Sequence, residues 1–452
     1  MYSRNGKNYL TSMKRIKPRD GNKTFCMAPW THTYMSPQME RRLCCSSLEE
    51  STNFKQYIDS DGPKGDNNLG LHSLEQHWNS DYMKGIRKDL MAGKEIPQCA
   101  VCNHKLLNAQ VYRQHFNRMY SPQVDEAFEK TDDDGHTDMN VSSFDYRFSN
   151  LCSFSCRMCG DMLSSSWESE NRKNGVDYET KNLWGRKDIK EQLKQFHDQQ
   201  VVKEFMEAVE NKTVKEFYWC GGEPLMWKIH WEAMQRVIDL GYSDSVLARY
   251  NSNMSRIDYY GKNLFEDILS KFKYWQINAS IDGTGEIGEY IRTGLDYKSW
   301  LKNMRHAKKY AKNPRDLQLD LTVTLPGLFD LENMHELSKD LKVPLLCKKV
   351  FSFSSDNLMS PLALPRELLE EIVTGVQDRF TDKPSVFNMA YIEGLKDLKN
   401  HKTYQEKYGE EEYRSGLKKG KARLEYLDKI RGTDITKILA KNKKVLDWWT
   451  SI

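Results

Sequence analysis

The chain has 452 residues, of which 38% are hydrophobic, 11% aromatic and 29% charged. This length excludes a single small module, since domains are commonly about 100 to 150 residues long, and the aromatic content argues against a disordered chain. The 68 Lys and Arg nearly balance the 64 Asp and Glu, so the formal net charge of +4 demands neither a nucleic acid nor a membrane surface as partner.

The first 140 residues show little regular pattern. Residues 1–24 are basic and patternless, so we expect a flexible arm, followed by a Cys-rich module over residues 25–125. Within that module, residues 71–90 keep the apolar spacing of a helix. Residues 121–140 are acidic and poor in apolar side chains, which predicts a linker.

Six short β-like runs alternate with helical segments in the next part of the chain. Because parallel neighbours need a crossover connection, this alternation predicts a parallel sheet. We therefore expect an α/β fold: a partial (β/α)6 TIM-like barrel over residues 140–355, with a helical C-terminal extension over residues 356–452. The expected strands cover residues 143–148, 214–219, 246–250, 275–281, 317–324 and 345–353.

The end of the chain is basic, with 13 basic and 8 acidic side chains in residues 401–452. Its Lys-rich part, residues 417–444, suits either a solvated helix face or an acidic partner, and we favour the solvated face. Ile435, Ile438 and Leu439 form an apolar stripe that we expect to dock this segment on the body of the protein.

The ten cysteines are the most informative residues. No stretch has the apolar length of a signal peptide or a membrane span, so we expect a cytoplasmic protein with no membrane partner. A reducing compartment disfavours disulfides, and clustered cysteines there are typical of metal sites or catalytic thiols. Eight of the ten fall in two clusters: Cys26, Cys44, Cys45, Cys99 and Cys102, and then Cys152, Cys156 and Cys159.

The second cluster follows the first expected strand, in the segment FSNLCSFSCRMCGD. Cys152, Cys156 and Cys159 form a C-x3-C-x2-C motif there. Three thiolates on so short a loop suit a [4Fe-4S] cluster that keeps one iron open for another ligand. The alternative is a structural zinc site, which needs a fourth ligand and usually shows paired C-x2-C knuckles.

This motif and three others on the following strands resemble those of the radical S-adenosylmethionine (SAM) enzymes. Met254 departs from the family pattern, which usually has Gly at that position. The matching residues are Gly221, Gly222, Glu223 and Pro224 in WCGGEPLM, Ser252 and Asn253 in YNSNMS, Ser280, Asp282 and Gly283 in NASIDG, and Arg292 in YIRTG.

The resemblance implies a mechanism. Cys152, Cys156 and Cys159 would be the metal ligands of a catalytic [4Fe-4S] cluster whose open iron binds SAM. An electron from an external donor would pass through the cluster and split SAM into methionine and a 5′-deoxyadenosyl radical, which takes a hydrogen atom from the substrate. The residues implied to bind SAM are Met158, Gly221, Gly222, Glu223, Ser252, Asn253, Ser280 and Asp282.

A second glycine pattern needs a separate interpretation. Gly283, Gly285 and Gly288 satisfy G-x-G-x-x-G, the dinucleotide-binding fingerprint. That fingerprint normally opens a fold after its first strand, whereas this segment follows the fourth expected strand. We therefore expect these glycines to shape a loop under SAM.

The N-terminal cysteines resemble the auxiliary-cluster modules called SPASM and twitch, although those modules commonly follow the barrel. Five cysteines suit one cluster, and so the smaller twitch form. The alternative is a structural zinc site, for which the C-x2-C spacing is equally suitable. We expect an auxiliary [4Fe-4S] cluster on Cys26, Cys44, Cys99 and Cys102, with Cys45 as the alternative to Cys44.

These features together predict a radical SAM oxidoreductase or maturase. Families with such a module often modify a peptide or protein side chain, which is our first expectation for the substrate. A dehydrogenase acting on a small sugar, aminocyclitol or nucleotide stays open, as does an iron-sulfur or electron-transfer protein that never cleaves SAM. The intact GGEP and S-x-D-G turns argue against the last alternative, because electron transfer alone needs no SAM pocket.

Overall fold

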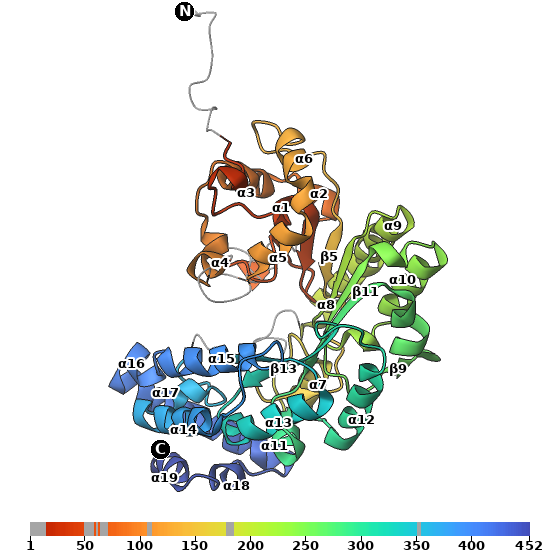
Figure 1. Cartoon of the computed structure of the whole chain (residues 1–452). Coiled ribbons are helices and arrows are strands. Elements are labelled where there is room, and N and C mark those ends of the chain that lie inside the picture. Colours follow the sequence, from red (N-terminus) through yellow and green to blue (C-terminus); the bar gives the residue numbers. More distant parts are fainter. Residues whose placement is uncertain are drawn as a thin grey trace, which may run out of the picture. The chain divides into compact units, whose positions relative to one another are not determined.

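The computed structural model describes residues 15–48, 58–59, 62–63, 71–105, 111–177, 185–349 and 354–452. The chain forms two compact units (Figure 1). Unit 1 comprises Met1–Ser149, Asn174–Gly221 and Ile229–Ala248, and unit 2 comprises Asn150–Lys173, Gly222–Lys228 and Arg249–Ile452. No helix in the described part of the chain is both long and apolar enough to cross a membrane.

The largest element is an eight-stranded, mostly parallel sheet. Each strand pair whose register is described is parallel, except that of the last two strands in the order. This arrangement confirms the expected α/β class with a partial TIM-like barrel. The strands lie in the order β14 (Leu345–Lys349), β13 (Leu317–Val323), β11 (Tyr274–Ser280), β8 (Leu247–Ser252), β7 (Glu216–Trp219), β5 (Ser143–Tyr146), β1 (His32–Met35) and β2 (Arg41–Arg42).

All six expected strands occur, and residues 350–353 of the last expected run lie outside the described residues. The two strands from the Cys-rich region, β1 and β2, were not expected. Strand β1 pairs in parallel with β5, from His32 opposite Ser143 to Met35 opposite Tyr146. All four residues of β1 are buried, but the short sequence HTYM has no alternation of polar and apolar side chains that would reveal a strand.

Helices and short ribbons connect the strands. The three two-stranded ribbons of the described residues are β3 (Ile58–Asp59) with β4 (Gly62–Pro63), β6 (Ser155–Cys156) with β12 (Arg292–Thr293), and β9 (Asp258–Tyr259) with β10 (Lys262–Asn263). The helices before β8 are η1 (Pro18–Asp20), α1 (Ala28–Thr31), α2 (Leu74–Trp78), α3 (Asp81–Met91), η2 (Pro97–Cys99), α4 (Ala100–Lys105), α5 (Tyr112–Met119), η3 (Ser121–Gln123), α6 (Val124–Glu129), α7 (Ser165–Lys173), α8 (Lys187–Phe196), η5 (His197–Val201), α9 (Val202–Glu210), η6 (Pro224–Met226), α10 (Lys228–Asp239) and η7 (Ser243–Ser245).

After β8, helices alternate with the remaining strands and then form the expected C-terminal extension. They are η8 (Leu264–Ile268), η9 (Leu269–Lys271), α11 (Gly285–Ile291), α12 (Tyr297–Lys308), η10 (Pro326–Asp330), α13 (Leu331–Leu341), η11 (Pro361–Ala363), α14 (Arg366–Arg379), α15 (Met389–Asn400), α16 (Tyr404–Tyr408), α17 (Glu410–Arg431), α18 (Thr436–Leu439) and α19 (Lys443–Ser451).

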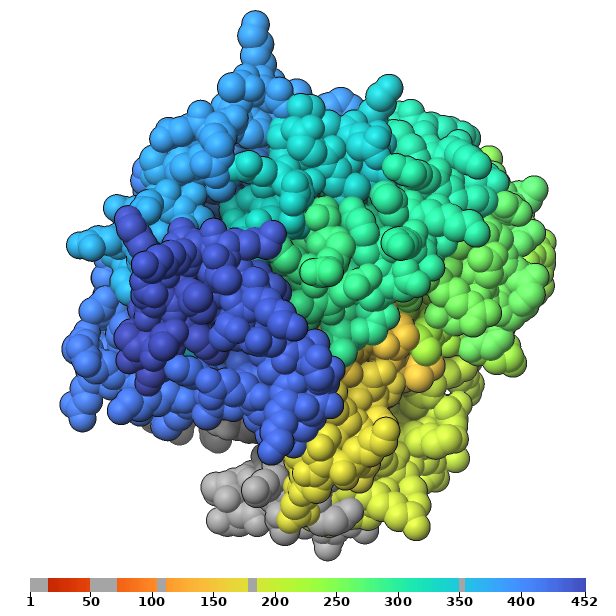
Figure 2. All heavy atoms as spheres, turned by 90° about the horizontal axis from the view of Figure 1, so that it is seen from below, coloured from red at the N-terminus to blue at the C-terminus, as the bar shows by residue number. Residues whose placement is uncertain are grey.

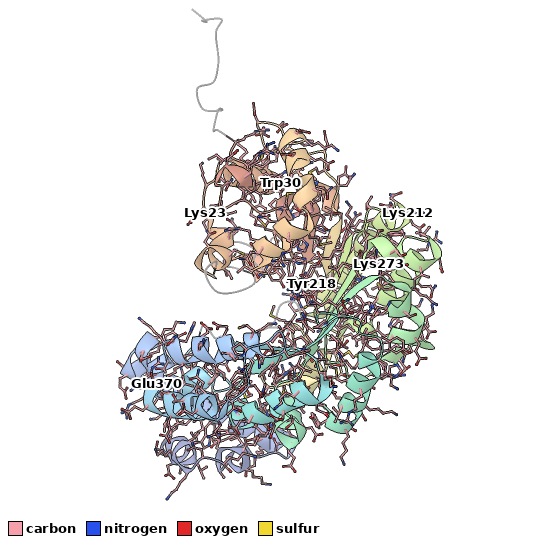
Figure 3. All side chains as sticks on the ribbon, viewed as in Figure 1. Lys23, Trp30, Lys212, Tyr218, Lys273 and Glu370 are labelled. Atoms are coloured by element: carbon pink, nitrogen blue, oxygen red, sulfur yellow. The ribbon has the colours of Figure 1, made fainter. Side chains whose placement is uncertain are left out.

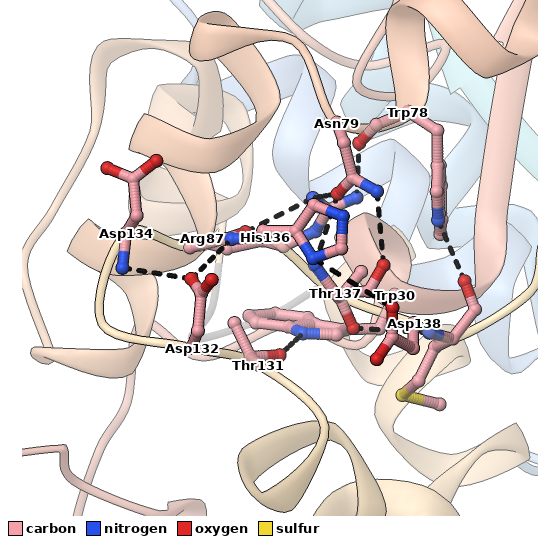
Figure 4. A network of polar contacts seen from close by, with 12 residues as sticks. Trp30, Trp78, Asn79, Arg87, Thr131, Asp132, Asp134, His136, Thr137 and Asp138 are labelled. Carbon is pink, nitrogen blue, oxygen red and sulfur yellow. Dashed lines mark hydrogen bonds and ion pairs between the residues drawn. The ribbon is translucent and has the colours of Figure 1, made fainter.

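The acidic segment 121–140 is not a linker, contrary to the prediction. It contains helix α6 and then a loop that is bonded into unit 1 (Figure 4). The indole nitrogen of Trp30 donates to Thr131 Oγ1 at 2.7 Å. The fully buried Arg87 donates to Asn79 Oδ1 at 2.9 Å and to the carbonyl of Gly135 at 3.3 Å. Composition failed here because bonds to residues far away in the sequence hold the segment, such as that of Arg87 to the carbonyl of Gly135, and composition reveals no such bond.

Residues 15–24, the second part of the expected flexible arm, are not a free arm in the structure. Residues 1–14 lie outside the described residues, but residues 15–24 are bonded to unit 1. The amide of Ile16 donates to the carbonyl of Met91 at 2.6 Å, and Arg15 Nη1 donates to the carbonyl of Thr131 at 2.6 Å. Asn22 Nδ2 donates to the carbonyl of Leu90 at 2.8 Å.

Aromatic side chains fill the core of unit 1. The ring of Phe205 in α9 lies 5.5 Å from that of Phe217 and 5.9 Å from that of Trp219, measured between centroids. Trp30, which Figure 3 labels, is fully buried and stacks on Phe25 at 5.1 Å. Such contacts add specific geometry to the burial of large apolar surfaces.

The C-terminal extension packs on the rest of unit 2, partly through the expected apolar stripe. Ile435, Ile438 and Leu439 are all buried, which confirms the apolar stripe. Helix α17 also makes a close backbone contact through Gly416 and Gly420, which the sequence analysis did not single out. A Cβ at either glycine would lie under 3.0 Å from the backbone, at Ser355 and Asp356 respectively.

We predict that Gly420→Ala destabilises the protein, although Ala is about 1 kcal/mol better than Gly within a helix. The added methyl would meet the fixed backbone of Asp356. Gly375→Ala in α14 is the matched control, because its nearest neighbour is the flexible end of Arg379. Thermal unfolding should show a lower Tm for Gly420→Ala and an equal or higher Tm for Gly375→Ala; equal effects would contradict the packing.

Candidate active site

The cysteine loop, residues 150–160, has little regular structure of its own. Only β6 pairs, antiparallel to β12, so that Cys156 lies opposite Arg292. The start of α7 holds the first cysteine: Ser166 Oγ donates to the carbonyl of Cys152 at 2.7 Å, and the amide of Cys152 donates to Ser165 Oγ at 3.1 Å. The conformation of the loop is therefore set by its neighbours.

The turn after β7 approaches the loop closely, and its glycine is required there. A Cβ on Gly222 would lie under 3.0 Å from the carbonyl oxygen of Leu151, so no larger residue fits without a shift. The amide of Glu223 donates to that same carbonyl at 2.7 Å. Gly221 has φ of 137°, which also favours glycine.

The Glu223 side chain is buried and fully bonded. Its carboxylate accepts hydrogen bonds from Ser252 Oγ at 2.8 Å, from the amide of Asn253 at 2.7 Å and from the amide of Leu225 at 3.2 Å. Burial raises the pKa of Glu223 to about 7, against the lowering effect of these bonds. The carboxylate thus shapes the turn after β8. The expected binding of SAM by Glu223 stays a prediction.

Two polar side chains approach the cysteine sulfurs. Asn253 Nδ2 lies 4.0 Å from Cys152 Sγ, and Arg292 Nη1 lies 3.9 Å from Cys156 Sγ. Burial raises the pKa of Cys152 and of Cys156 to about 12 and raises that of Cys159 as well, while the positive charge of Arg292 acts to lower all three. Arg292 therefore favours the thiolate forms that metal binding needs.

Asp282 fixes the position of Arg292. Its fully buried carboxylate lies 2.6 Å from Arg292 Nε and accepts a hydrogen bond from the amide of Thr322 at 2.8 Å. Of the other expected SAM ligands, Ser280 is the last residue of β11 and half-buried. Met158 is half-buried within the cysteine loop.

The arrangement of the three thiols fits an iron-sulfur cluster. The charge of Cys159 raises the pKa of both Cys152 and Cys156, so the three side chains lie near one another. Three thiols on one short loop suit a [4Fe-4S] cluster that keeps one iron open for another ligand.

A polar ladder, which the sequence analysis missed, crosses strands β8, β11, β13 and β14. Asn278 Nδ2 donates to Asn251 Oδ1 at 3.0 Å, and Asn251 Nδ2 donates to Asp320 Oδ2 at 3.4 Å. Lys348 Nζ lies 2.7 Å from Asp320 Oδ1. Asp320 is also the register partner of Ser280. The available signal was polar residues at alternate positions of apolar strands, as in QINAS and LQLDLTV.

The G-x-G-x-x-G glycines close a turn. A Cβ on Gly288 would fall under 3.0 Å from the backbone of Gly283, and one on Gly283 would meet Ile287. Two of the three glycines therefore allow the start of α11 to pack on the end of β11. This contact explains them without a dinucleotide.

In unit 1, four buried cysteines come from separate elements. Cys26 precedes α1, Cys44 follows β2, Cys99 ends η2 and Cys102 lies in α4. Burial is the main cause that raises the pKa of Cys26, and the charges of Cys99 and Cys102 add to it. For Cys44, burial is again the main cause, followed by the charges of the adjacent Cys45, of Cys26 and of Cys99. These thiols therefore lie near one another.

Cys45 has other neighbours. After burial, the charge of Asp145 is the next cause that raises the pKa of Cys45, to about 12, and Arg147 and Tyr112 act to lower it. Cys44, by contrast, is influenced by Cys26 and Cys99. This influence favours Cys44 over Cys45 as the partner of the other three thiols.

A three-cysteine loop, a glycine-glycine-glutamate turn and polar ends of neighbouring parallel strands define the class of SAM-dependent radical enzymes. Residues 146–341 match the family model described as the Radical SAM superfamily. This region is therefore a radical SAM domain, and the protein is a radical SAM enzyme. A radical SAM domain implies a [4Fe-4S] cluster and SAM as cofactors.

The chain was also compared with solved structures and with curated proteins. Among solved structures, a match is SuiB of Streptococcus suis bound to the precursor peptide SuiA, at 11% identity and a TM-score of 0.34, covering 68% of this chain and 67% of SuiB. A TM-score this low carries no argument about fold or substrate. The comparison with curated proteins gives no match.

We predict different effects for two substitutions in this site. Ser280→Ala should weaken SAM binding by about 1 to 3 kcal/mol, the cost of one lost hydrogen bond, and leave the iron content unchanged. Glu223→Gln should lower both the SAM affinity and the iron content. The carboxylate accepts hydrogen bonds from Ser252, Asn253 and Leu225, and the amide group of Gln would face these donors. Equilibrium dialysis with SAM and iron analysis measure the two properties. Unchanged SAM affinity in both variants would mean that the pocket lies elsewhere.

Proposed function

We propose that this enzyme cleaves SAM reductively and uses the resulting radical to abstract hydrogen from a peptide or protein side chain. The observation that carries the proposal is the C-x3-C-x2-C loop, held beside a closely packed glycine turn and a buried arginine. When bound, the [4Fe-4S] cluster supplies the electron that breaks a carbon–sulfur bond of SAM.

The side chains around the loop have separate tasks in this proposal. Cys152, Cys156 and Cys159 are the cluster ligands, and Arg292 favours their thiolate forms. Glu223 holds the turn that carries Asn253 toward Cys152. Gly221, Gly222, Ser252, Asn253, Ser280, Asp282 and Met158 line the SAM site, with Asp282 and Glu223 acting through the groups that they bind.

We propose that Cys26, Cys44, Cys99 and Cys102 hold an auxiliary [4Fe-4S] cluster. Their mutual influence in unit 1 supports a shared metal centre on these four thiols. A [4Fe-4S] cluster can accept the substrate's electron, which zinc cannot do. The Cys-rich module over residues 25–125, the barrel over residues 140–355, a cytoplasmic location and an external electron donor belong to the same proposal.

The polar ladder of Asn251, Asn278, Asp320 and Lys348 bears on the substrate. It lies on strands that also carry expected SAM ligands, and Asn278 Oδ1 is buried without a hydrogen-bond partner. Buried polar groups usually have such partners, so the ladder suits a substrate with several hydrogen-bonding groups. A peptide has such groups, and so does a small sugar or nucleotide. The ladder therefore also supports the second candidate function, a dehydrogenase that acts on a small sugar or nucleotide.

We predict that Cys156→Ala abolishes SAM cleavage while the protein still folds. Two remaining thiolates cannot hold a site-differentiated cluster with one open iron. Anaerobically reconstituted and reduced protein should release 5′-deoxyadenosine from SAM only when Cys156 is present, with Cys347→Ala as a matched control outside both cysteine clusters. Cleavage retained by Cys156→Ala would refute the ligand assignment, and absence of cleavage by the wild type would favour an electron-transfer role.

Metal content separates the auxiliary cluster from a zinc site. Two [4Fe-4S] clusters need eight irons per chain, whereas one such cluster with zinc needs four irons and one zinc. We predict that a Cys152, Cys156 and Cys159 triple-Ala variant keeps about four irons after anaerobic reconstitution. Retention of zinc without iron would contradict an oxidative role for the N-terminal module. In the wild-type background, Cys44→Ala should lose these irons and Cys45→Ala should keep them.

A further inference from the structure

The end of helix α17 meets the cysteine loop within unit 2. Figure 2 shows the C-terminal helices, in blue, against the yellow segment that includes α7. Helix α17 ends at Arg431, and Gly432 with φ of 65° turns the chain toward Thr433. Two arginines, one from each side of this contact, carry the interaction.

Arg157 lies between two cluster ligands in the sequence and reaches the C-terminal extension. Its Nη2 lies 2.8 Å from Asp428 Oδ1 and donates to Thr433 Oγ1 at 2.5 Å. Its guanidinium carbon lies 3.9 Å from the ring centroid of Tyr290, whose carbonyl accepts from Nε at 2.9 Å. The side chain is fully buried. The backbone beside Cys156 is thus tied to α17.

Arg431 makes the second tie. It binds both carboxylate oxygens of Glu170 in α7, at 2.7 and 3.0 Å, and donates to Thr293 Oγ1 at 3.1 Å. Its guanidinium carbon also lies 4.5 Å from the ring centroid of Trp167. That indole in turn donates to the carbonyl of Cys156 at 2.7 Å. Arg431 therefore supports the same cysteine through Trp167.

Asp428 is bonded on several sides. Besides Arg157, its carboxylate accepts from Thr433 Oγ1 at 2.7 Å and from the amide of Ile435 at 2.8 Å. Burying charge pairs is costly, and well-packed apolar residues often give equal stability. Their use here, where the chain carries cluster ligands, favours a role in geometry over one in stability alone.

We propose that Asp428 and Arg431 are positioning residues for the cysteine loop. They fix the backbone around Cys156 and thereby hold the thiols in the arrangement that binds the cluster. This inference rests on the proposed cluster ligands. It gives the C-terminal extension a part in the active site, although the extension carries no motif of its own.

The test uses two variants and a control on the same helix. Asp428→Asn keeps the shape and removes the charge, and Arg431→Lys keeps the charge and loses the two-oxygen geometry. Arg414→Met is the control, because Arg414 pairs with the exposed Glu410 one turn away, within the same helix. For each full-length protein we would measure the rate of iron transfer to a chelator, the electron paramagnetic resonance (EPR) signal of the reduced cluster, and the thermal transition of the metal-free chain.

All variants would be built on a chain whose four N-terminal cluster cysteines are replaced by Ala, so that the iron reports the loop alone. We expect iron loss at least about tenfold faster, and an altered EPR signal, in at least one of the two variants, with the control unchanged. Arg431→Lys keeps the test valid if Asp428→Asn does not fold. The inference would be overturned if the folded variants keep the wild-type rate of iron loss and EPR signal, or if the control changes equally. It would also be overturned if the rate of iron loss rises only in proportion to a lower Tm of the metal-free chain. Failure of the parent chain to bind iron would instead refute the proposed function.

Discussion

The close approach of the turn after β7 to the cysteine loop is the constraint on which the site depends. Within the loop, strand pairing is limited to Ser155 and Cys156, and bonds from neighbouring segments hold much of the rest. Gly222 lets the two backbones meet, and the amide of Glu223 closes the contact on Leu151. From there the carboxylate of Glu223 continues to the turn after β8. One glycine and one glutamate thus connect the segments after three neighbouring strands of the sheet.

Charge is arranged around this contact in pairs. Burial opposes thiolate formation at Cys152 and Cys156, and Arg292 offsets part of that effect. Asp282 forms an ion pair with Arg292, and Asp428 forms one with Arg157, the residue that follows Cys156. A free cation would be costly in so buried a place, so each arginine near the loop has its own carboxylate.

The sequence alone predicts features that depend on patterns among residues close together in the chain. Strand periodicity and cysteine spacing revealed the sheet and the loop, because both depend on residues a few positions apart. Strand β1 escaped prediction because its four residues, HTYM, show no pattern of polar and apolar side chains and lie in an irregular, Cys-rich part of the sequence. The tie from Arg157 to Thr433 joins residues 276 positions apart, which no local pattern reports. The structural use of Glu223 was also missed, since a motif gives the residue but not the direction of its carboxylate.

The central claim, that SAM binds an open iron on the Cys152, Cys156 and Cys159 cluster, is most directly tested with isotope-labelled SAM. Reduced protein that carries only this cluster would be examined by EPR and electron–nuclear double resonance with SAM labelled by ¹⁵N at the amino group. Our account predicts a changed cluster signal and a resolved coupling to the labelled nitrogen. An unchanged signal without coupling, from protein that holds its full iron, would contradict it.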